Sequence, residues 1–164
     1  MAKRKARAGS PSRRRPAAAD STAGEALPLR YIESSALVAA LLERDVAARA
    51  AIRAAGRRVS SKLTIAEATR AVILARVTGR ISTADERAAV RALQVFALRC
   101  DLVAVTDAVL ERVARPFPVE PLRTLDAVHL ATAELLGEPP ALVSVVTRDA
   151  RVRENALALG YAVE

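Results

Sequence analysis

The sequence is poor in cysteine and in aromatic residues. One cysteine, Cys100, excludes an internal disulfide bond and a cysteine zinc site, and it fits a reducing compartment. Aromatic residues make up only 2% of a chain that is 52% hydrophobic, so the core must consist of alanine, leucine and valine. Small side chains let secondary-structure elements approach closely, which favours helices packed on a sheet.

Membrane and secretion signals are also lacking. No apolar stretch approaches the length of a membrane span, and no apolar run follows the first basic residues as a secretory signal would require. No expected strand is followed by a glycine-rich loop, which disfavours a doubly wound nucleotide-binding protein. We therefore expect a cytoplasmic protein with no membrane partner.

Positive charge is in excess, with 26 Lys and Arg against 18 Asp and Glu, for a formal net charge of +8. An anionic partner is therefore expected. Residues 1–28 hold seven of the basic residues and two acids among Pro, Ser, Ala and Gly, a composition typical of disorder. This tail is either a nucleic-acid-binding arm or a solubilising extension, and it has no aromatic residues to stack on bases.

Strand-like and helix-like segments alternate after the tail. Short strands are expected near residues 29–32, 57–61, 100–105, 141–146 and 161–163, and helices over residues 36–42, 45–55, 63–77, 82–99, 107–113, 124–136 and 150–159. Alternation of this kind, with right-handed crossovers, produces a parallel sheet. The sequence thus predicts one α/β domain over residues 29–164.

Residues 124–136 place an acidic residue, Asp126, near the start of an apolar helical pattern. Leu125, Val128 and Leu135 belong to the expected buried face, so Asp126, in the first turn, lies beside the core rather than in open water. A carboxylate in such a place needs a cation, a hydrogen-bond donor or the helix N-terminus to stabilise it. His129 shares that face and is interpreted as a packed or supporting residue rather than a metal ligand.

Four carboxylates are expected at one edge of the sheet. Glu33 and Asp149 follow expected strands, while Glu67 and Asp126 lie in the first turns of helices. Each acid has an alternative explanation as a helix cap or first-turn acid, and Glu67 has the capping-box spacing from Thr64. Together the four would repel one another unless a divalent cation neutralised them, and oxygen ligands suit Mg²⁺ or Mn²⁺. Such a site in a basic protein indicates phosphodiester chemistry.

Four segments occur in the order found in PIN-domain proteins, namely residues 31–38 (YIESSALV), 63–67 (LTIAE), 124–133 (TLDAVHLATA) and 146–149 (VTRD). From about residue 29 to residue 164 the chain resembles the VapC-type toxin ribonucleases of that family. The resemblance implies a three-layer α/β/α sandwich with a central, mostly parallel sheet. It also implies a Mg²⁺- or Mn²⁺-dependent endoribonuclease acting on RNA, frequent homodimerisation, and a small antitoxin protein as partner.

The resemblance also assigns roles to individual positions. The catalytic and metal-binding acids would be Glu33, Glu67, Asp126 and Asp149, with Ser34 in support. Apart from the resemblance, we expect His129 to support the site and Arg148 and Arg151 to contact RNA. The family usually has Asp where this chain has Glu33, and the added methylene moves the carboxylate by about 1.5 Å. The alternative function is a catalytically inactive domain of the same fold that binds RNA or a partner protein.

Overall fold

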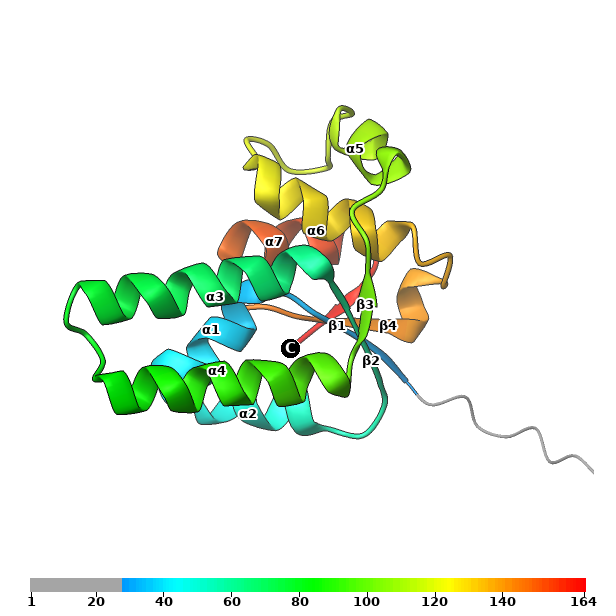
Figure 1. The fold of residues 1–164 in the computed structure, drawn as a ribbon. Coiled ribbons are helices and arrows are strands. Elements are labelled where there is room, and N and C mark those ends of the chain that lie inside the picture. Colours follow the sequence, from blue (N-terminus) through cyan, green and yellow to red (C-terminus); the bar gives the residue numbers. More distant parts are fainter. Residues whose placement is uncertain (1–27) are drawn as a thin grey trace, which may run out of the picture.

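The computed structural model describes residues 28–164 (Figure 1). At its centre is a five-stranded sheet in which every neighbouring pair of strands runs parallel, in the order β3-β2-β1-β4-β5. The strands are β1 (Leu29–Ile32), β2 (Arg57–Ser61), β3 (Asp101–Val103), β4 (Val143–Val146) and β5 (Ala162–Val163). The parallel sheet is therefore confirmed, whereas the interpretation of the basic tail falls on residues 1–27, outside the described range.

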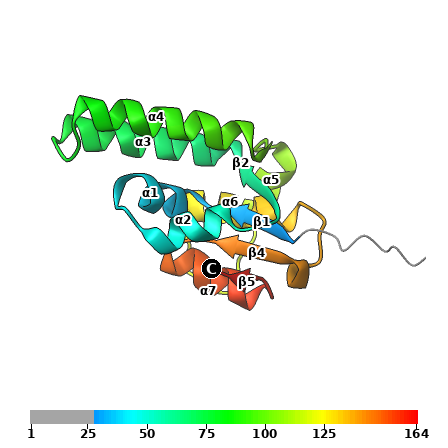
Figure 2. The same cartoon turned by 90° about the horizontal axis from the view of Figure 1, so that it is seen from below.

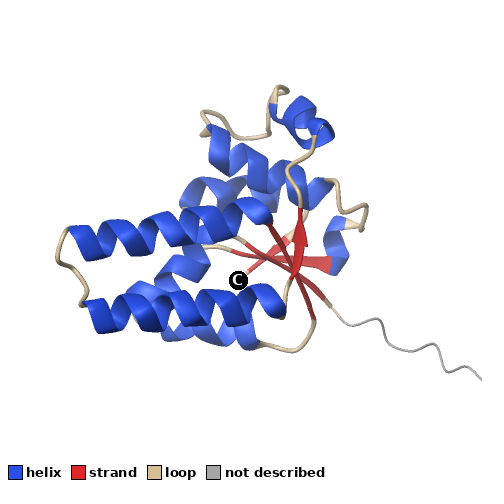
Figure 3. Ribbon diagram, in the orientation of Figure 1, coloured by secondary structure: helices blue, strands red, loops and turns tan. Residues whose placement is uncertain are grey.

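Helices cover both faces of the sheet, which gives three layers (Figures 2 and 3). One face carries α1 (Ser34–Leu42), α2 (Val46–Arg53), α3 (Lys62–Val77) and α4 (Thr83–Leu98), and the other carries α5 (Asp107–Val113), α6 (Thr124–Glu134) and α7 (Ala150–Ala158). A 3-10 turn, Pro140–Leu142, leads into β4. The sandwich that the family resemblance implies is thus confirmed.

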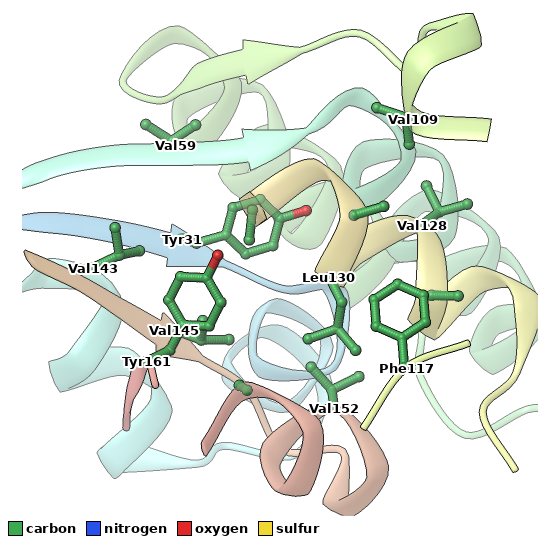
Figure 4. Close-up of a cluster of buried hydrophobic side chains, with 14 of the residues drawn as sticks. Tyr31, Val59, Val109, Phe117, Val128, Leu130, Val143, Val145, Val152 and Tyr161 are labelled. Carbon is green, nitrogen blue, oxygen red and sulfur yellow. The ribbon is translucent and has the colours of Figure 1, made fainter. Parts of the chain in front are cut away.

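The alternation of side chains along the strands divides the core into two parts. Tyr31 of β1 and Val145 of β4 point toward α6 and α7, in the cluster that Figure 4 shows. Ile32 and Val146, the next residue of each strand, pack against α1, α3 and α4 on the other face. The last residues of β1 and β4 are therefore buried, and the segments that follow them emerge side by side at the carboxyl edge.

The middle of α6 is buried on all sides, since every residue from Ala127 to Ala133 is buried. This helix packs between α5 and α7 as well as against the sheet, and its small alanines permit that close approach. The prediction that Leu125 and Leu135 belong to the buried face was wrong. These residues, near the two ends of α6, are 49% and 51% exposed. Neither α6 nor another helix within residues 28–164 has the length and hydropathy of a membrane span.

The start of α3 differs from the prediction. The helix begins at Lys62 and is capped by Ser61, whose hydroxyl accepts a hydrogen bond from the N–H of Leu63 at 3.2 Å. Glu67 therefore lies in the second turn and not the first, and the predicted capping box with Thr64 is not formed. Thr64 is instead buried and accepts a 2.8 Å hydrogen bond from Ser60. Its burial beside β2 explains why it cannot serve as an exposed cap.

Candidate active site

The candidate site lies where the strand order reverses. From β1 the sheet grows through β2 and β3 on one side and through β4 and β5 on the other, so β1 and β4 are neighbours across the reversal. Ligands bind at this point in open parallel sheets, outside the carboxyl ends of the strands. Glu33 directly follows β1 and Asp149 lies shortly beyond β4, while Glu67 on α3 and Asp126 on α6 approach from the two helical layers.

Glu33 is only 2% exposed, and its carboxylate caps α1. The backbone N–H of Ser35 donates to both carboxylate oxygens at 3.0 Å, and the hydroxyl of Ser34 donates to Oε1 at 2.6 Å. The hydroxyls of Ser35 and Thr147 both donate to Oε2, the second at 2.8 Å. The helix-cap interpretation thus describes the local geometry of Glu33, and Ser34 contacts it as expected.

The side chain of Glu33 is long enough to make two sets of contacts. Glutamate is not among the favoured N-cap residues, which are shorter. Here the additional methylene lets the carboxylate reach Thr147 at the end of the neighbouring strand while it still caps its own helix. Because donors surround both oxygens and the carboxylate lies at the N-terminus of α1, this buried group needs no cation to satisfy it.

Glu67 is held by the buried imidazole of His129. Nε2 of His129 lies 2.7 Å from Oε2 of Glu67 and 3.8 Å from Oε1 of Glu33, while Nδ1 lies 3.0 Å from the hydroxyl of Tyr31. Burial acts to raise the pKa of Glu67, but the hydrogen bond from His129 acts in the opposite direction, and the pKa is lowered. His129 therefore lies between two of the predicted acids, in a position that suits a supporting residue.

Asp126 and Asp149 form the other half of the site. Asp149 caps α7, since its Oδ1 accepts hydrogen bonds from the N–H groups of Arg151 at 2.8 Å and Val152 at 3.2 Å. Oδ2 of Asp126 is buried without a hydrogen-bond partner. Burial raises the pKa of Asp126, and the negative charges of Asp149 and Glu33 raise it further. A cation beside this oxygen would relieve both the lost solvation and the repulsion.

The oxygen donors at this edge suit a hard divalent cation. Mg²⁺ is commonly bound through one or two carboxylates and keeps several water ligands, so Asp126 and Asp149 fit such an ion. Within residues 28–164, no three side chains of His, Cys, Asp and Glu converge closely enough to hold one ion in common. The four acids therefore share an edge but not a single point, because Glu33 turns into the α1 cap and Glu67 turns toward His129.

The two arginines predicted to contact RNA are placed differently. Nε of Arg148 lies 2.7 Å from Oδ2 of Asp45, and its guanidinium also donates to two backbone carbonyls. These contacts tie the segment after β4 to the start of α2. Arg151 is exposed in the first turn of α7, and the part of the chain that the structure describes provides it with no ion pair. Arg151 is therefore the more available of the two.

Three side chains of the site are not singled out by the sequence patterns, namely Tyr31, Ser35 and Thr147. Thr147 directly follows the β-branched run of β4, and Ser35 is the second residue of a Ser-Ser pair, so both positions carry a weak local signal. Their common role at Glu33 depends on β1 and β4 being neighbours. Strand order is a long-range property that no local pattern in this sequence reports.

A separate groove, with a volume of about 810 Å³, opens between α4 and the pair α1 and α2. Its floor is apolar and includes Leu37, Ile52 and Phe96, while Asp85 is the one acid among its lining residues. Seven arginines line it, namely Arg44, Arg49, Arg53, Arg58, Arg80, Arg91 and Arg99. An apolar floor with a basic rim is complementary to an amphipathic helix that carries acidic residues beside its apolar face.

Known proteins resemble both the sequence and the fold. Ribonuclease VapC46 of Mycobacterium tuberculosis is 40% identical over 140 residues, which cover 81% of this chain and 94% of that protein. Ribonuclease VapC35 of the same species is 47% identical over 57 residues, which cover 35% of this chain and 42% of that protein, so this match spans less than half of VapC35.

The fold likeness extends to a solved structure, VapBC-1 from nontypeable Haemophilus influenzae, with a TM-score of 0.53 over 83% of this chain and 96% of that one. At 11% identity this likeness shows the fold alone. The PIN domain family matches residues 30–157. Together with the nearly full-length match to VapC46, this places the chain in the PIN-domain family, among its VapC-type members.

Proposed function

We propose that this chain is a Mg²⁺- or Mn²⁺-dependent endoribonuclease and the toxin of a type II toxin–antitoxin pair. The observation that carries the proposal is the buried, unpartnered Oδ2 of Asp126, repelled by Asp149 at the carboxyl edge of a parallel sheet. Two of its relatives bear the name ribonuclease. RNA is a polyanion, so the excess of positive charge on this chain would also attract it.

The roles of the acids follow from their surroundings. Asp126 and Asp149 would hold the divalent cation, since one has an orphan oxygen and the other lies beside it. When bound, such a cation supplies an activated water and stabilises the leaving oxygen of the phosphodiester. Glu67 has a side chain that is 23% exposed, and its lowered pKa keeps it ionised, so it can accept a hydrogen bond from the attacking water and orient it.

Glu33 has a different part in the proposal. Its carboxylate is held by hydroxyl and N–H donors, so it contributes negative charge to the cation site while it fixes the ends of β1 and β4. Direct coordination would require it to exchange at least one of these donors for the ion. Mn²⁺ demands less exact geometry than Mg²⁺, so we expect Mn²⁺ to support the higher activity.

The test is RNA cleavage by the purified chain, freed of metal and inhibitor and then supplied with Mg²⁺ or Mn²⁺. Asp126→Asn should abolish cleavage, because the amide keeps the shape but cannot neutralise a cation. Asp107→Asn is the matched control, since Asp107 is an exposed first-turn acid of α5 and should leave cleavage unchanged. Wild-type cleavage by Asp126→Asn, with cleavage by Asp107→Asn also unchanged, would refute the assigned chemistry.

The second candidate function is a catalytically inactive domain that binds RNA or a partner protein. The observation that favours it is the complete set of hydrogen bonds around Glu33, which leaves the first family acid committed to a structural role. The two functions differ in metal binding. A folded, inhibitor-free protein that neither cleaves RNA nor binds Mn²⁺ in calorimetry would establish the inactive domain.

The structure offers one groove as the binding site for the proposed antitoxin. The groove between α4 and the pair α1 and α2 combines an apolar floor with seven arginines, which suits an acidic amphipathic segment. A charge reversal such as Arg91→Glu on its rim should weaken capture of the proposed antitoxin. Arg115→Glu, outside the groove on the loop after α5, should not weaken it. Equal binding by both variants would exclude the groove as the antitoxin site.

A further inference from the structure

The proposed function does not account for two buried polar side chains, Tyr31 and His129. Each is 1% exposed, and they come from β1 and α6. They form a line of hydrogen bonds that ends on Glu67 of α3, with 3.0 Å between Tyr31 Oη and His129 Nδ1 and 2.7 Å between His129 Nε2 and Glu67 Oε2. The line therefore crosses the molecule from the α6 layer to the α3 layer, past the end of β1.

The chemistry of the three groups fixes the direction of these hydrogen bonds. An ionised carboxylate can only accept, so Nε2 of His129 carries the hydrogen that Glu67 accepts. In the neutral imidazole Nδ1 is then an acceptor, and the hydroxyl of Tyr31 donates to it. Burial raises the pKa of Tyr31 well above its ordinary value, so the hydroxyl keeps its hydrogen at neutral pH. Tyr31 thus selects the tautomer of His129 that can hold Glu67.

The position of the ring also decides which acid receives the N–H. Nε2 is 2.7 Å from Glu67 but 3.8 Å from Glu33, so a small rotation would move the hydrogen bond from one acid to the other. The ring of Tyr31 meets the imidazole edge-on, with centroids 6.1 Å apart and planes at 67°. Thr132, one turn after His129, donates to its own helix at Val128 O. Tyr31 is therefore the side chain that orients the imidazole.

We propose that Tyr31 and His129 are positioning residues that fix the Glu67 carboxylate for a cation bound at the edge it shares with Asp126 and Asp149. The inference rests on the proposed function and extends it, because Glu67 would then act on the cation as well as on the attacking water. Neither Tyr31 nor His129 contacts the substrate or the ion in this scheme. Their effect passes through a single carboxylate oxygen, Oε2 of Glu67.

The single histidine of the chain makes the first measurement direct, because its ¹⁵N signals need no assignment. Where the imidazole of the metal-free wild-type protein is neutral, its hydrogen should be on Nε2, which faces Glu67, and not on Nδ1. Tyr31→Phe removes one hydroxyl and leaves the ring, so Nδ1 loses its donor and the Nδ1–H tautomer should become detectable. Tyr161→Phe is the matched control, since Tyr161 is the other tyrosine of the chain and is buried in the same core cluster.

The second measurement is the affinity for Mn²⁺ by calorimetry. Tyr31→Phe should weaken Mn²⁺ binding by about 5-fold, the size expected for loss of one neutral hydrogen bond. His129→Leu should weaken it by about 10-fold or more, as is usual when the partner of a metal-site residue is removed. His129→Gln retains an N–H that can reach Glu67 and should recover part of that loss, which a purely packing role would not produce.

The outcomes separate the inference from the function on which it rests. The positioning role would be overturned if folded Tyr31→Phe kept either the wild-type tautomer or the wild-type Mn²⁺ affinity. If Asp126→Asn had lost activity in the same experiments, the proposed ribonuclease function would still stand. Equal losses of affinity in Tyr31→Phe and Tyr161→Phe would overturn the positioning role too, since the effect would then be one of core packing. Absence of Mn²⁺ binding by the wild-type protein would overturn the proposed function itself.

Discussion

The hydroxyl of Thr147 donates a 2.8 Å hydrogen bond to Oε2 of Glu33, which joins the residues that follow β4 and β1. The same hydroxyl accepts from the N–H of Asp149 at 3.1 Å. One threonine therefore connects the first acid of the site with the last. Because β1 and β4 pair with each other and each has a further neighbour in the sheet, the two acids follow strands that are hydrogen-bonded on both sides.

Replacement of Glu33 by Asp tests whether the site has adapted to the longer side chain. The carboxylate would retract by about 1.5 Å and lose Thr147, so RNA cleavage should fall by about 10-fold, although Asp is itself a good N-cap. Steady-state cleavage with Mg²⁺ and with Mn²⁺ provides the measurement. A rise in activity would show instead that Glu33 impairs a site built for Asp.

Asp126→Asn should stabilise the metal-free fold at neutral pH. The folded-state pKa of Asp126 is raised above its ordinary value of 3.8, so the ionised carboxylate destabilises the fold above that raised pKa. This cost shrinks as the pH falls through the raised pKa and disappears below 3.8, where the carboxyl is protonated in both states. Thermal unfolding should therefore show a gain for the variant at pH 7 that shrinks toward pH 4. A gain that is the same at both pH values would contradict this explanation.

We expect Arg151 to bind RNA and Arg148 to stabilise the fold. Arg151→Ala removes an exposed cation, so it should weaken RNA binding and lower the slope of log affinity against log salt by about 1, with no change in thermal stability. Arg148→Ala breaks the contact with Asp45 and should lower the unfolding temperature. The opposite pattern, with the stability loss in Arg151→Ala, would show that the two roles are exchanged.

Asn155 should be a stability residue of the loop that leads to α6. It is fully buried, and its amide accepts from Val119 N and donates to Val119 O, both at 2.9 Å, and to Arg151 O at 3.0 Å. Asn155→Ala should lower the free energy of unfolding in denaturant by about 2 kcal/mol, because these groups lose their partner. Glu154→Ala, an exposed neighbour on the same helix, should have no measurable effect.

Deletion of residues 1–28 tests the part of the basic charge that lies outside the domain. If these residues contact RNA, they act through charge, because they hold seven basic residues and no aromatic ones. Their removal should weaken RNA binding equally for all sequences and lower its salt dependence. Unchanged salt dependence would identify the segment as a solubilising extension.

The sequence by itself determined the local features of this protein. The run Val143–Val146 is a strand because its residues are β-branched apart from Ser144, and the helix before Gly79 ends where that residue adopts a φ of +71°. Ser82 caps α4 through hydrogen bonds with Asp85, three residues away. The central helix with Asp126 in its first turn was also predictable, because periodicity and capping are interactions between near neighbours in the chain.

Only the tertiary structure decided what each carboxylate does. Glu33 receives a hydrogen bond from Thr147, 114 residues away, and Glu67 contacts His129, 62 residues away. The sequence predicted both acids at the carboxyl edge of the sheet, but their orientations depend on donors that arrive from other strands and helices. A buried carboxylate turns toward whichever donors the packing brings to it, and neither the spacing of residues nor their periodicity specifies those donors.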